Sequence, residues 1–258
     1  MKTKTPNGVR DLLHEDLVIR EKIIAKIKTV FESYNYERIR TPVLEFYDTL
    51  EKGLSPELKE KSVTFIDHTG ERMILRPDMT TPIARVIATR MKNDPAVSRL
   101  YYLENIFRRD EISTGSHSEF LQIGLELIGS PGEKADNEVI EIAQETLEAI
   151  GLKNFKVDVG NINDFDKFTE DQKQKLSNLD FVSLNILPKK EMLVLKDFDY
   201  YTGMIFECYI PEMGCLLGSG GRYDNLISNF GLQKPAVGFA FNLERLITAL
   251  QIQQSGEK

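Results

Sequence analysis

Polar side chains that could bind a small molecule gather at the ends of several apolar segments. Asp78 precedes a predicted helix start, where a carboxylate can either cap the helix or receive an ammonium group. Further along, Gln122, Gly124 and Glu126 alternate on one predicted strand, so all three face the same side of a sheet. Two polar groups flanking a glycine among apolar neighbours are typical of a pocket floor, although an exposed sheet face would have the same pattern.

Two later clusters combine glycines with tyrosines and charged groups. They cover residues 196–203 and 218–224, and their glycines allow another group to approach the backbone closely. Arg222 and Asp224 in the second cluster can also pair with each other for purely structural reasons. Near the end of the chain, Arg245 enters a helix at a position where it can face a phosphate or pair with a carboxylate.

The motifs of several common enzyme classes are absent from the sequence. There is no phosphate loop ending in Gly-Lys-Ser/Thr, no His-Glu-x-x-His and no Gly-x-Ser-x-Gly. Of the three histidines, His68 falls in a predicted turn and His117 in a polar loop, which favours solvent exposure over catalysis. The two cysteines, Cys208 and Cys215, are too few for a disulfide framework or a zinc site, and we expect both to be structural thiols.

Composition places the chain among ordinary globular proteins. Its 258 residues are 41% hydrophobic and 28% charged, with a formal net charge of −7 that argues against broad binding to nucleic acid. No apolar run approaches the roughly 20 residues that cross a bilayer, and the start of the chain lacks the apolar segment of a signal peptide. We therefore expect a cytoplasmic protein that forms one domain over residues 1–258 without membrane association.

Helices and strands are mixed along the chain, with strands mostly following strands. Helices are expected where apolar residues recur on one face, at residues 16–34, 81–91, 133–150 and 243–250. Strands are expected where β-branched and aromatic residues gather, at residues 35–46, 63–67, 73–76, 98–109, 119–128, 155–159, 191–195, 204–210, 215–217 and 237–241. This order predicts an α+β domain in which helices flank an antiparallel sheet.

In order along nearly the whole chain, these segments resemble the signature motifs of class II aminoacyl-tRNA synthetases of the histidyl type. Residues 6–11 resemble the opening of that family and residues 40–45, with Pro42, its dimer motif. The other matching segments are residues 76–80, 107–126, 199–203, 220–224 and 238–246.

The resemblance implies a histidine site and a neighbouring nucleotide site. Asp78 and Thr80 would receive the α-amino group, Gln122 would orient the amino-acid backbone, and Glu126 with Tyr200 would bind the imidazole. Arg108 would meet the carboxylate or a phosphate, with Tyr201 beside the ligand. The residues implied for a vestigial nucleotide site are Phe120, Lys196 and Arg245.

Several departures from the synthetase pattern argue against aminoacylation. Lys196 stands where the family has a catalytic arginine, and lysine lacks the planar fork that binds a carboxylate or phosphate through two bonds. The loop at residues 115–118 lacks the usual arginines, the segment 161–190 is short, and the sequence ends soon after the last motif, without an anticodon-binding domain.

The family that fits best is the histidyl-tRNA synthetase-like regulatory subunits of ATP phosphoribosyltransferase. The resemblance implies a non-catalytic subunit without cofactor or metal that assembles with a short-form catalytic chain, as a homodimer or higher hetero-oligomer, and binds histidine as effector but no tRNA. Two alternatives remain open. One is a minimal ligase that activates histidine or another amino acid for an acceptor other than tRNA, and the other is a structural dimer with a vestigial pocket.

Overall fold

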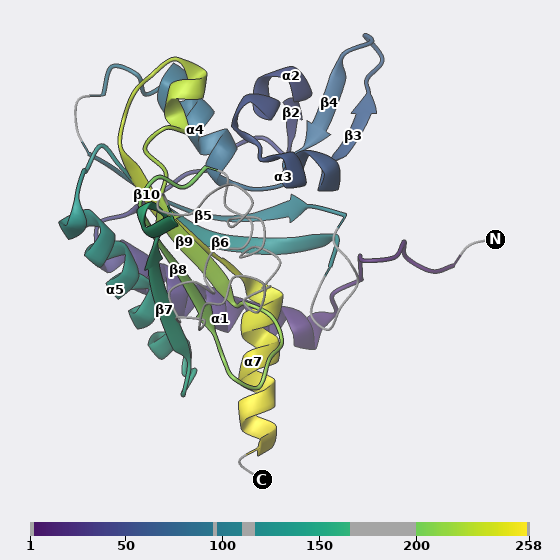
Figure 1. Ribbon diagram of the computed structural model, residues 1–258. Coiled ribbons are helices and arrows are strands. Elements are labelled where there is room, and N and C mark those ends of the chain that lie inside the picture. The colour runs from purple at the N-terminus through teal and green to yellow at the C-terminus, as the bar shows by residue number, and fades with distance from the viewer. Residues whose placement is uncertain (1–2, 95–96, 110–116, 166–199, 257–258) are drawn as a thin grey trace, which may run out of the picture.

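Two sheets form the framework of the protein (Figure 1). The structure, a computed structural model, describes residues 3–94, 97–109, 117–165 and 200–256. The strands of the larger sheet are, in spatial order, β1 (Glu37–Arg38), β5 (Ser98–Phe107), β6 (Glu119–Ile128), β10 (Ala236–Asn242), β9 (Gly218–Arg222), β8 (Met204–Tyr209) and β7 (Lys156–Asn161). The strands of the smaller sheet are β2 (Leu44–Phe46), β4 (Arg72–Leu75) and β3 (Val63–Ile66).

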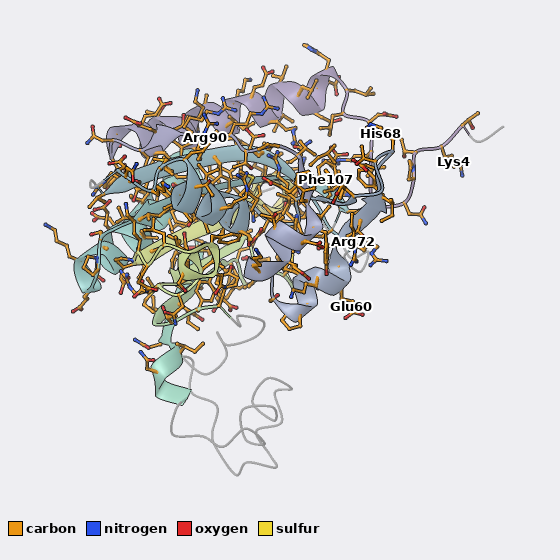
Figure 2. The ribbon with its side chains drawn as sticks, turned by 90° about the horizontal axis from the view of Figure 1, so that it is seen from above. Lys4, Glu60, His68, Arg72, Arg90 and Phe107 are labelled. Carbon is orange, nitrogen blue, oxygen red and sulfur yellow. The ribbon has the colours of Figure 1, made fainter. Side chains whose placement is uncertain are left out.

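The strand pairs confirm the predicted antiparallel arrangement with one exception. Strands β1 and β5 run parallel, whereas every other pair of neighbours among the described strands is antiparallel. The expected hairpin is present, because β3 and β4 pair from Val63 opposite Leu75 to Ile66 opposite Arg72. His68, at the tip of this hairpin, is exposed as predicted and lies at the same end of the molecule as Lys4 (Figure 2).

Helices cover both faces of the larger sheet (Figure 1). Buried residues of α1 (His14–Ser33), α5 (Glu133–Ile150) and α7 (Leu243–Gly256) pack on one face. Residues of α4 (Thr80–Thr89) and the 3₁₀ turn η4 (Ile227–Phe230) pack on the other. The short elements between β2 and β3, and after β7, are α2 (Tyr47–Leu50), η1 (Glu51–Gly53), α3 (Pro56–Lys61) and η2 (Ile162–Phe165).

The helices predicted from apolar spacing are confirmed with small shifts at their ends. Helix α5 has the predicted bounds, and Gly151 follows it with a φ of +95°, the left-handed conformation that ends many helices. None of the helices in the described ranges is long and apolar enough to cross a membrane.

Two predicted strands are wrong, and another lies outside the described residues. The single strand expected at residues 35–46 is two short strands in different sheets, β1 and β2, because the chain leaves the larger sheet before Pro42. The strand expected at residues 215–217 is absent; β9 starts at Gly218 and uses the glycine-rich segment instead. A Cβ atom at Gly218 would lie 2.2 Å from the Ala240 carbonyl oxygen, so glycine is required where β9 and β10 approach each other. The strand expected at residues 191–195 falls in the part of the chain that is not described.

Successive side chains of β6 point to opposite faces of the larger sheet, one packed in the core and one polar. Ile123, Leu125 and Leu127 belong to the core beneath α1 and α5. Gln122 and Glu126 lie on the opposite face, as the period of two predicts.

Candidate functional site

A cavity of about 470 Å³ lies on the polar face of the larger sheet. Strands β6, β9 and β10 form its floor, and residues of α3 and the start of α4 form its wall. Nine of the ten residues that the sequence assigned to a binding site line this one cavity: Asp78, Thr80, Arg108, Phe120, Gln122, Glu126, Tyr200, Tyr201 and Arg245. The tenth, Lys196, lies outside the described residues.

Asp78 both supports the start of α4 and presents an acceptor to the cavity. Its Oδ2 accepts a hydrogen bond from Thr81 Oγ1 at 3.1 Å, while its Oδ1 is buried and has no hydrogen-bond partner. The side chain is only 5% exposed, and this burial raises the pKa of Asp78 to about 6, although Arg108 acts in the opposite direction. Asp78 therefore holds the first turn of α4 through Thr81 but does not cap the helix, whose N-cap residue is Met79, and its Oδ1 is available to a ligand that donates a hydrogen bond.

Glu126 is the more deeply buried carboxylate of the cavity. Thr80 Oγ1 donates to its Oε1 at 2.8 Å, and the hydroxyl of Tyr223 donates to its Oε2. Burial raises the pKa of Glu126 to about 8, and the nearby carboxylate of Asp78 adds to this effect. Each carboxylate oxygen has two lone pairs, so each can accept a further hydrogen bond from a ligand.

Gln122 has a partner that the sequence did not predict. Its Oε1 accepts from the backbone N–H of Met79 at 3.0 Å, which joins β6 to the residue between Asp78 and Thr80. Gln122 therefore holds the loop that carries both of these side chains.

Three tyrosines form an aromatic wall beside Glu126. The rings of Tyr200 and Tyr201 lie 4.7 Å apart between centroids, and the ring of Tyr200 meets that of Tyr223 edge to face at 6.1 Å. Burial raises the pKa values of all three hydroxyls, so they remain neutral donors and acceptors at physiological pH. No role of its own was predicted for Tyr223, because its place beside Glu126 depends on how β9 and β6 are arranged in the sheet.

Phe120 and Arg245, which the resemblance assigned to a vestigial nucleotide site, line the same cavity as Arg108. The guanidinium carbon of Arg108 lies 5.1 Å from the centre of the Phe120 ring. Arg245 Nη1 donates to the Leu216 carbonyl oxygen at 2.9 Å, while its Nε is buried and has no hydrogen-bond partner. These side chains therefore give the cavity two cations and an aromatic ring.

Other residues singled out by the sequence have structural roles. Arg222 Nη1 donates to Asp224 Oδ1 at 3.0 Å, which confirms the structural pairing, and its Nε donates to Asp136 Oδ1 at 2.8 Å. Arg76 is buried and donates to Glu104 Oε2 at 3.0 Å and to the Thr41 carbonyl oxygen at 2.7 Å.

The expectations for His117 and the cysteines have different outcomes. The prediction that His117 is exposed was wrong, because its side chain is half-buried. This burial lowers the pKa of its imidazole. Cys208 and Cys215 are free thiols, the first buried and the second half-buried. No group of three or more metal-binding side chains occurs in the described ranges.

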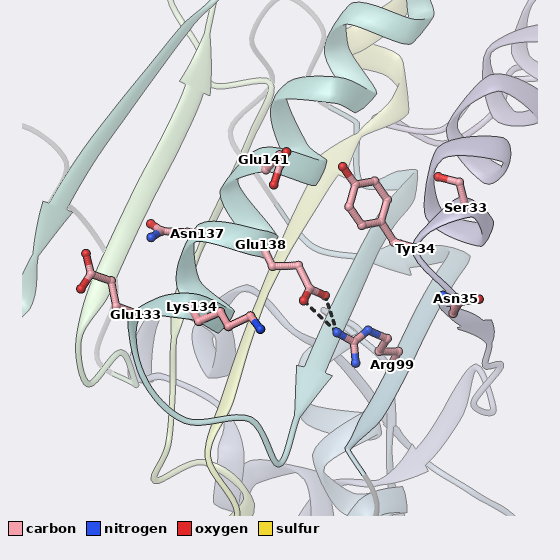
Figure 3. A pocket seen from close by; sticks show the side chains of 9 residues that line it. All are labelled: Ser33, Tyr34, Asn35, Arg99, Glu133, Lys134, Asn137, Glu138 and Glu141. Atoms are coloured by element: carbon pink, nitrogen blue, oxygen red, sulfur yellow. Dashed lines mark hydrogen bonds and ion pairs between the residues drawn. The ribbon is translucent and has the colours of Figure 1, made fainter.

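A second hollow, of about 780 Å³, lies between the end of α1 and the first half of α5 (Figure 3). Arg99 forms an ion pair with Glu138 across it at 2.7 Å. Tyr34 and Glu141 also line it, and none of the predicted site residues does.

The sequence matches known proteins along most of its length. The family model of histidyl-tRNA synthetase matches residues 8–192 and 189–246. An ATP phosphoribosyltransferase regulatory subunit of Clostridium botulinum is 31% identical over 97% of this chain and 76% of its own length. The corresponding protein of Thermoanaerobacter pseudethanolicus is 32% identical over 96% of this chain and 83% of its own length. The first alignment spans 323 positions, 65 more than the residues of this chain, so that relative has segments with no counterpart here.

Solved structures agree with these matches. A crystal structure from Bacillus halodurans, described as an ATP phosphoribosyltransferase regulatory subunit/histidyl-tRNA synthetase, has a TM-score of 0.85 and 26% identity, over 97% of this chain and 84% of that one. Histidyl-tRNA synthetase of Staphylococcus aureus without ligand has a TM-score of 0.76 and 28% identity, over 97% of this chain and 70% of that one. The fold is therefore that of the class II synthetases, and the chain belongs to the histidyl-tRNA synthetase-like family of ATP phosphoribosyltransferase regulatory subunits.

Proposed function

We propose that this chain assembles with the short-form catalytic chain of ATP phosphoribosyltransferase, activates it, and binds histidine in the described cavity as the feedback effector. Membership of a family of regulatory subunits supports the partner. The observation that supports the ligand is the placement of two buried carboxylates, Asp78 and Glu126, beside an aromatic wall in a single cavity.

The polar groups of the cavity fit those of histidine. The unpartnered Oδ1 of Asp78 suits the ammonium group, and the cation of Arg108 suits the carboxylate. Glu126 and Tyr200 remain for the imidazole, whose N–H groups need acceptors. Apolar surfaces of Tyr200 and Tyr201 would cover the ring.

Regulation requires that histidine binds two states of the complex with different affinity. Asp78 and Thr80 lie at the start of α4, and Gln122 ties this start to β6. A ligand held by both Asp78 and Glu126 would fix α4 relative to the sheet, so a shift of α4 is a change that histidine could favour or oppose. We propose a homodimer or a higher hetero-oligomer as the assembly in which this change reaches the catalytic chain.

The test is phosphoribosyl transfer by a short-form catalytic chain, measured with and without this protein and with added histidine. We expect this protein to raise the rate and histidine to lower it again. A rate that does not respond to this protein would exclude the proposed partner, and an activated rate that does not respond to histidine would exclude the effector.

Two cations and an aromatic ring in the cavity favour one alternative, an amino-acid ligase. Arg108, Phe120 and Arg245 line the same cavity as the two carboxylates, so ATP and an amino acid could meet there. Pyrophosphate exchange with ATP and histidine decides between the two functions. Steady exchange would support the ligase, whereas we expect none and also expect no transfer of histidine to tRNA.

A further inference from the structure

Glu126 is a buried carboxyl group whose hydrogen-bond partners are both neutral. Its side chain is 1% exposed, and the hydroxyls of Thr80 and Tyr223 occupy one acceptor position on each oxygen. None of the ion pairs among the described residues includes Glu126. A lone negative charge in such a place is costly, so the carboxyl group favours its neutral form.

The titratable groups that surround Glu126 do not supply a positive charge. They are a second carboxyl group and five tyrosine hydroxyls, contributed by the segment before β1, the loop before α4, β5, residues 200–201 and the end of β9: Tyr36, Asp78, Tyr102, Tyr200, Tyr201 and Tyr223. The charge of Arg108 acts on Asp78 and Tyr200. From β10, the residue opposite Glu126 is Gly238, which has no side chain.

We propose that Glu126 carries a proton in the empty cavity and passes it to the imidazole ring of bound histidine, so that the site holds the imidazolium form and selects a basic side chain. This inference rests on the proposed binding of histidine. The O–H bond of Glu126 breaks, and an N–H bond forms at the unprotonated ring nitrogen, whose lone pair takes the proton. The carboxylate keeps the bonding electrons, so no other reactant is needed.

Two opposing effects decide where the proton lies. The raised pKa of Glu126, about 8, against roughly 6.5 for an imidazole in water, disfavours transfer by roughly 30-fold, and burial of the ring in the cavity adds to this. Two opposite charges about 4 Å apart at an effective dielectric constant of about 20 favour transfer by roughly 1,000-fold. The hydroxyls of Thr80 and Tyr223 already point their donors at the carboxylate oxygens, so the ionised form is stabilised as soon as it forms.

Nitrogen NMR of ¹⁵N-labelled histidine bound to the full chain locates the proton. At about pH 7.5, where the ring of free histidine is mostly neutral, we expect both ring nitrogens of the bound ligand to show the protonated state. In the Glu126→Gln variant, which keeps the shape of the side chain but has no proton to transfer, we expect a neutral ring. A neutral ring bound to the unaltered protein would overturn this inference alone, whereas no binding of histidine would overturn the proposed function with it.

The pH dependence of affinity tests whether the complex keeps the one proton that Glu126 and the ring share, while the nitrogen NMR measurement shows which of the two carries it. Between about pH 6.5 and pH 8 the proton only changes place within the complex, so affinity should stay level. Above about pH 8 the empty site has lost its proton, so affinity for histidine should fall. Below about pH 6.5 free histidine and Glu126 are both protonated, so binding must release a proton and affinity should fall again. Protonation of Asp78, whose pKa is about 6, weakens binding further in this range. A neutral ring on an ionised Glu126 would instead make affinity rise roughly tenfold per pH unit up to pH 8.

Matched tyrosine variants separate this mechanism from a general structural role. Tyr223→Phe removes one donor from Glu126, which raises its pKa further and should move the alkaline fall in affinity to higher pH. Tyr36→Phe is the control, because Tyr36 is equally buried and donates to Glu138 at 3.2 Å on the other side of the sheet. An alkaline fall that shifts equally in both variants, or in neither, would contradict the assignment to Glu126.

Discussion

Replacing Gly238 with alanine should damage histidine binding and stability together. Gly238 lies directly opposite Glu126 in the pairing of β10 with β6. A Cβ atom at this position would lie 1.8 Å from Glu126 Oε2 and 2.4 Å from the Leu125 carbonyl oxygen. The carboxylate can rotate away, but the carbonyl belongs to the backbone of β6, so the two strands must also separate.

The expected magnitude follows from these two contacts. Moving the strands apart should lower the free energy of unfolding by about 1–3 kcal/mol, the usual cost of inserting an extra group into a well-packed site. Moving Glu126 away from the Tyr223 hydroxyl should cost about 0.5–1.5 kcal/mol more, because a hydrogen bond between two neutral groups is lost. We therefore expect Gly238→Ala to lower the free energy of unfolding by about 1.5–4.5 kcal/mol.

Urea unfolding and calorimetric titration with histidine measure the two parts separately. Gly214→Ala is the matched control, because a Cβ atom at Gly214 would meet nothing within 4 Å. That variant should differ from the unaltered protein by less than about 0.5 kcal/mol. If Gly238→Ala kept both its stability and its histidine affinity, the placement of Glu126 against β10 would be refuted.

Three further changes test other parts of the site. Glu126→Gln should remove the fall in the empty protein's stability in urea between about pH 6 and pH 8. The raised pKa of Glu126 contributes stability that is present below about pH 4 and lost as pH rises through about 8, by up to about 5 kcal/mol, whereas the raised pKa of Asp78, about 6, contributes to the fall at lower pH. An equally steep fall in the variant would show that Glu126 is not the group responsible. Asp78→Asn should weaken histidine binding by about 1.5–3 kcal/mol in calorimetry, since the ammonium group loses its charged acceptor, and unchanged affinity would exclude that contact. Arg222→Ala should lower stability to heat by about 3–5 kcal/mol, because Asp136 loses its buried partner; a difference below 1 kcal/mol would mean that this ion pair is not maintained in solution.

The parts of the site that the sequence could predict depend on local rules. The period of two along a strand places Gln122 and Glu126 on one face, and the break before α4 places Asp78 at a helix start. The family resemblance then joined residues far apart in the chain, such as Arg108 and Arg245, in one cavity. The cavity confirms their proximity, while their contacts with histidine remain proposals.

The parts that it could not predict depend on neighbours across the sheet. The bond from Tyr223 to Glu126 joins residues 97 positions apart, and no local pattern indicates it. Strand β9 was missed because glycine has a low preference for strands, and only the close approach of β8 and β10 requires glycine there. His117 was expected in solvent because its neighbours in the sequence are polar, whereas its burial depends on how the chain folds around it.

Calorimetric titration of the full chain with histidine tests the central claim most directly. We predict saturable binding of one histidine per chain, weakened by about 1–3 kcal/mol in Glu126→Ala because a buried hydrogen bond is lost. The absence of binding would contradict the claim that this cavity is a histidine site. Binding with unchanged affinity in Glu126→Ala would place the ligand elsewhere in the protein.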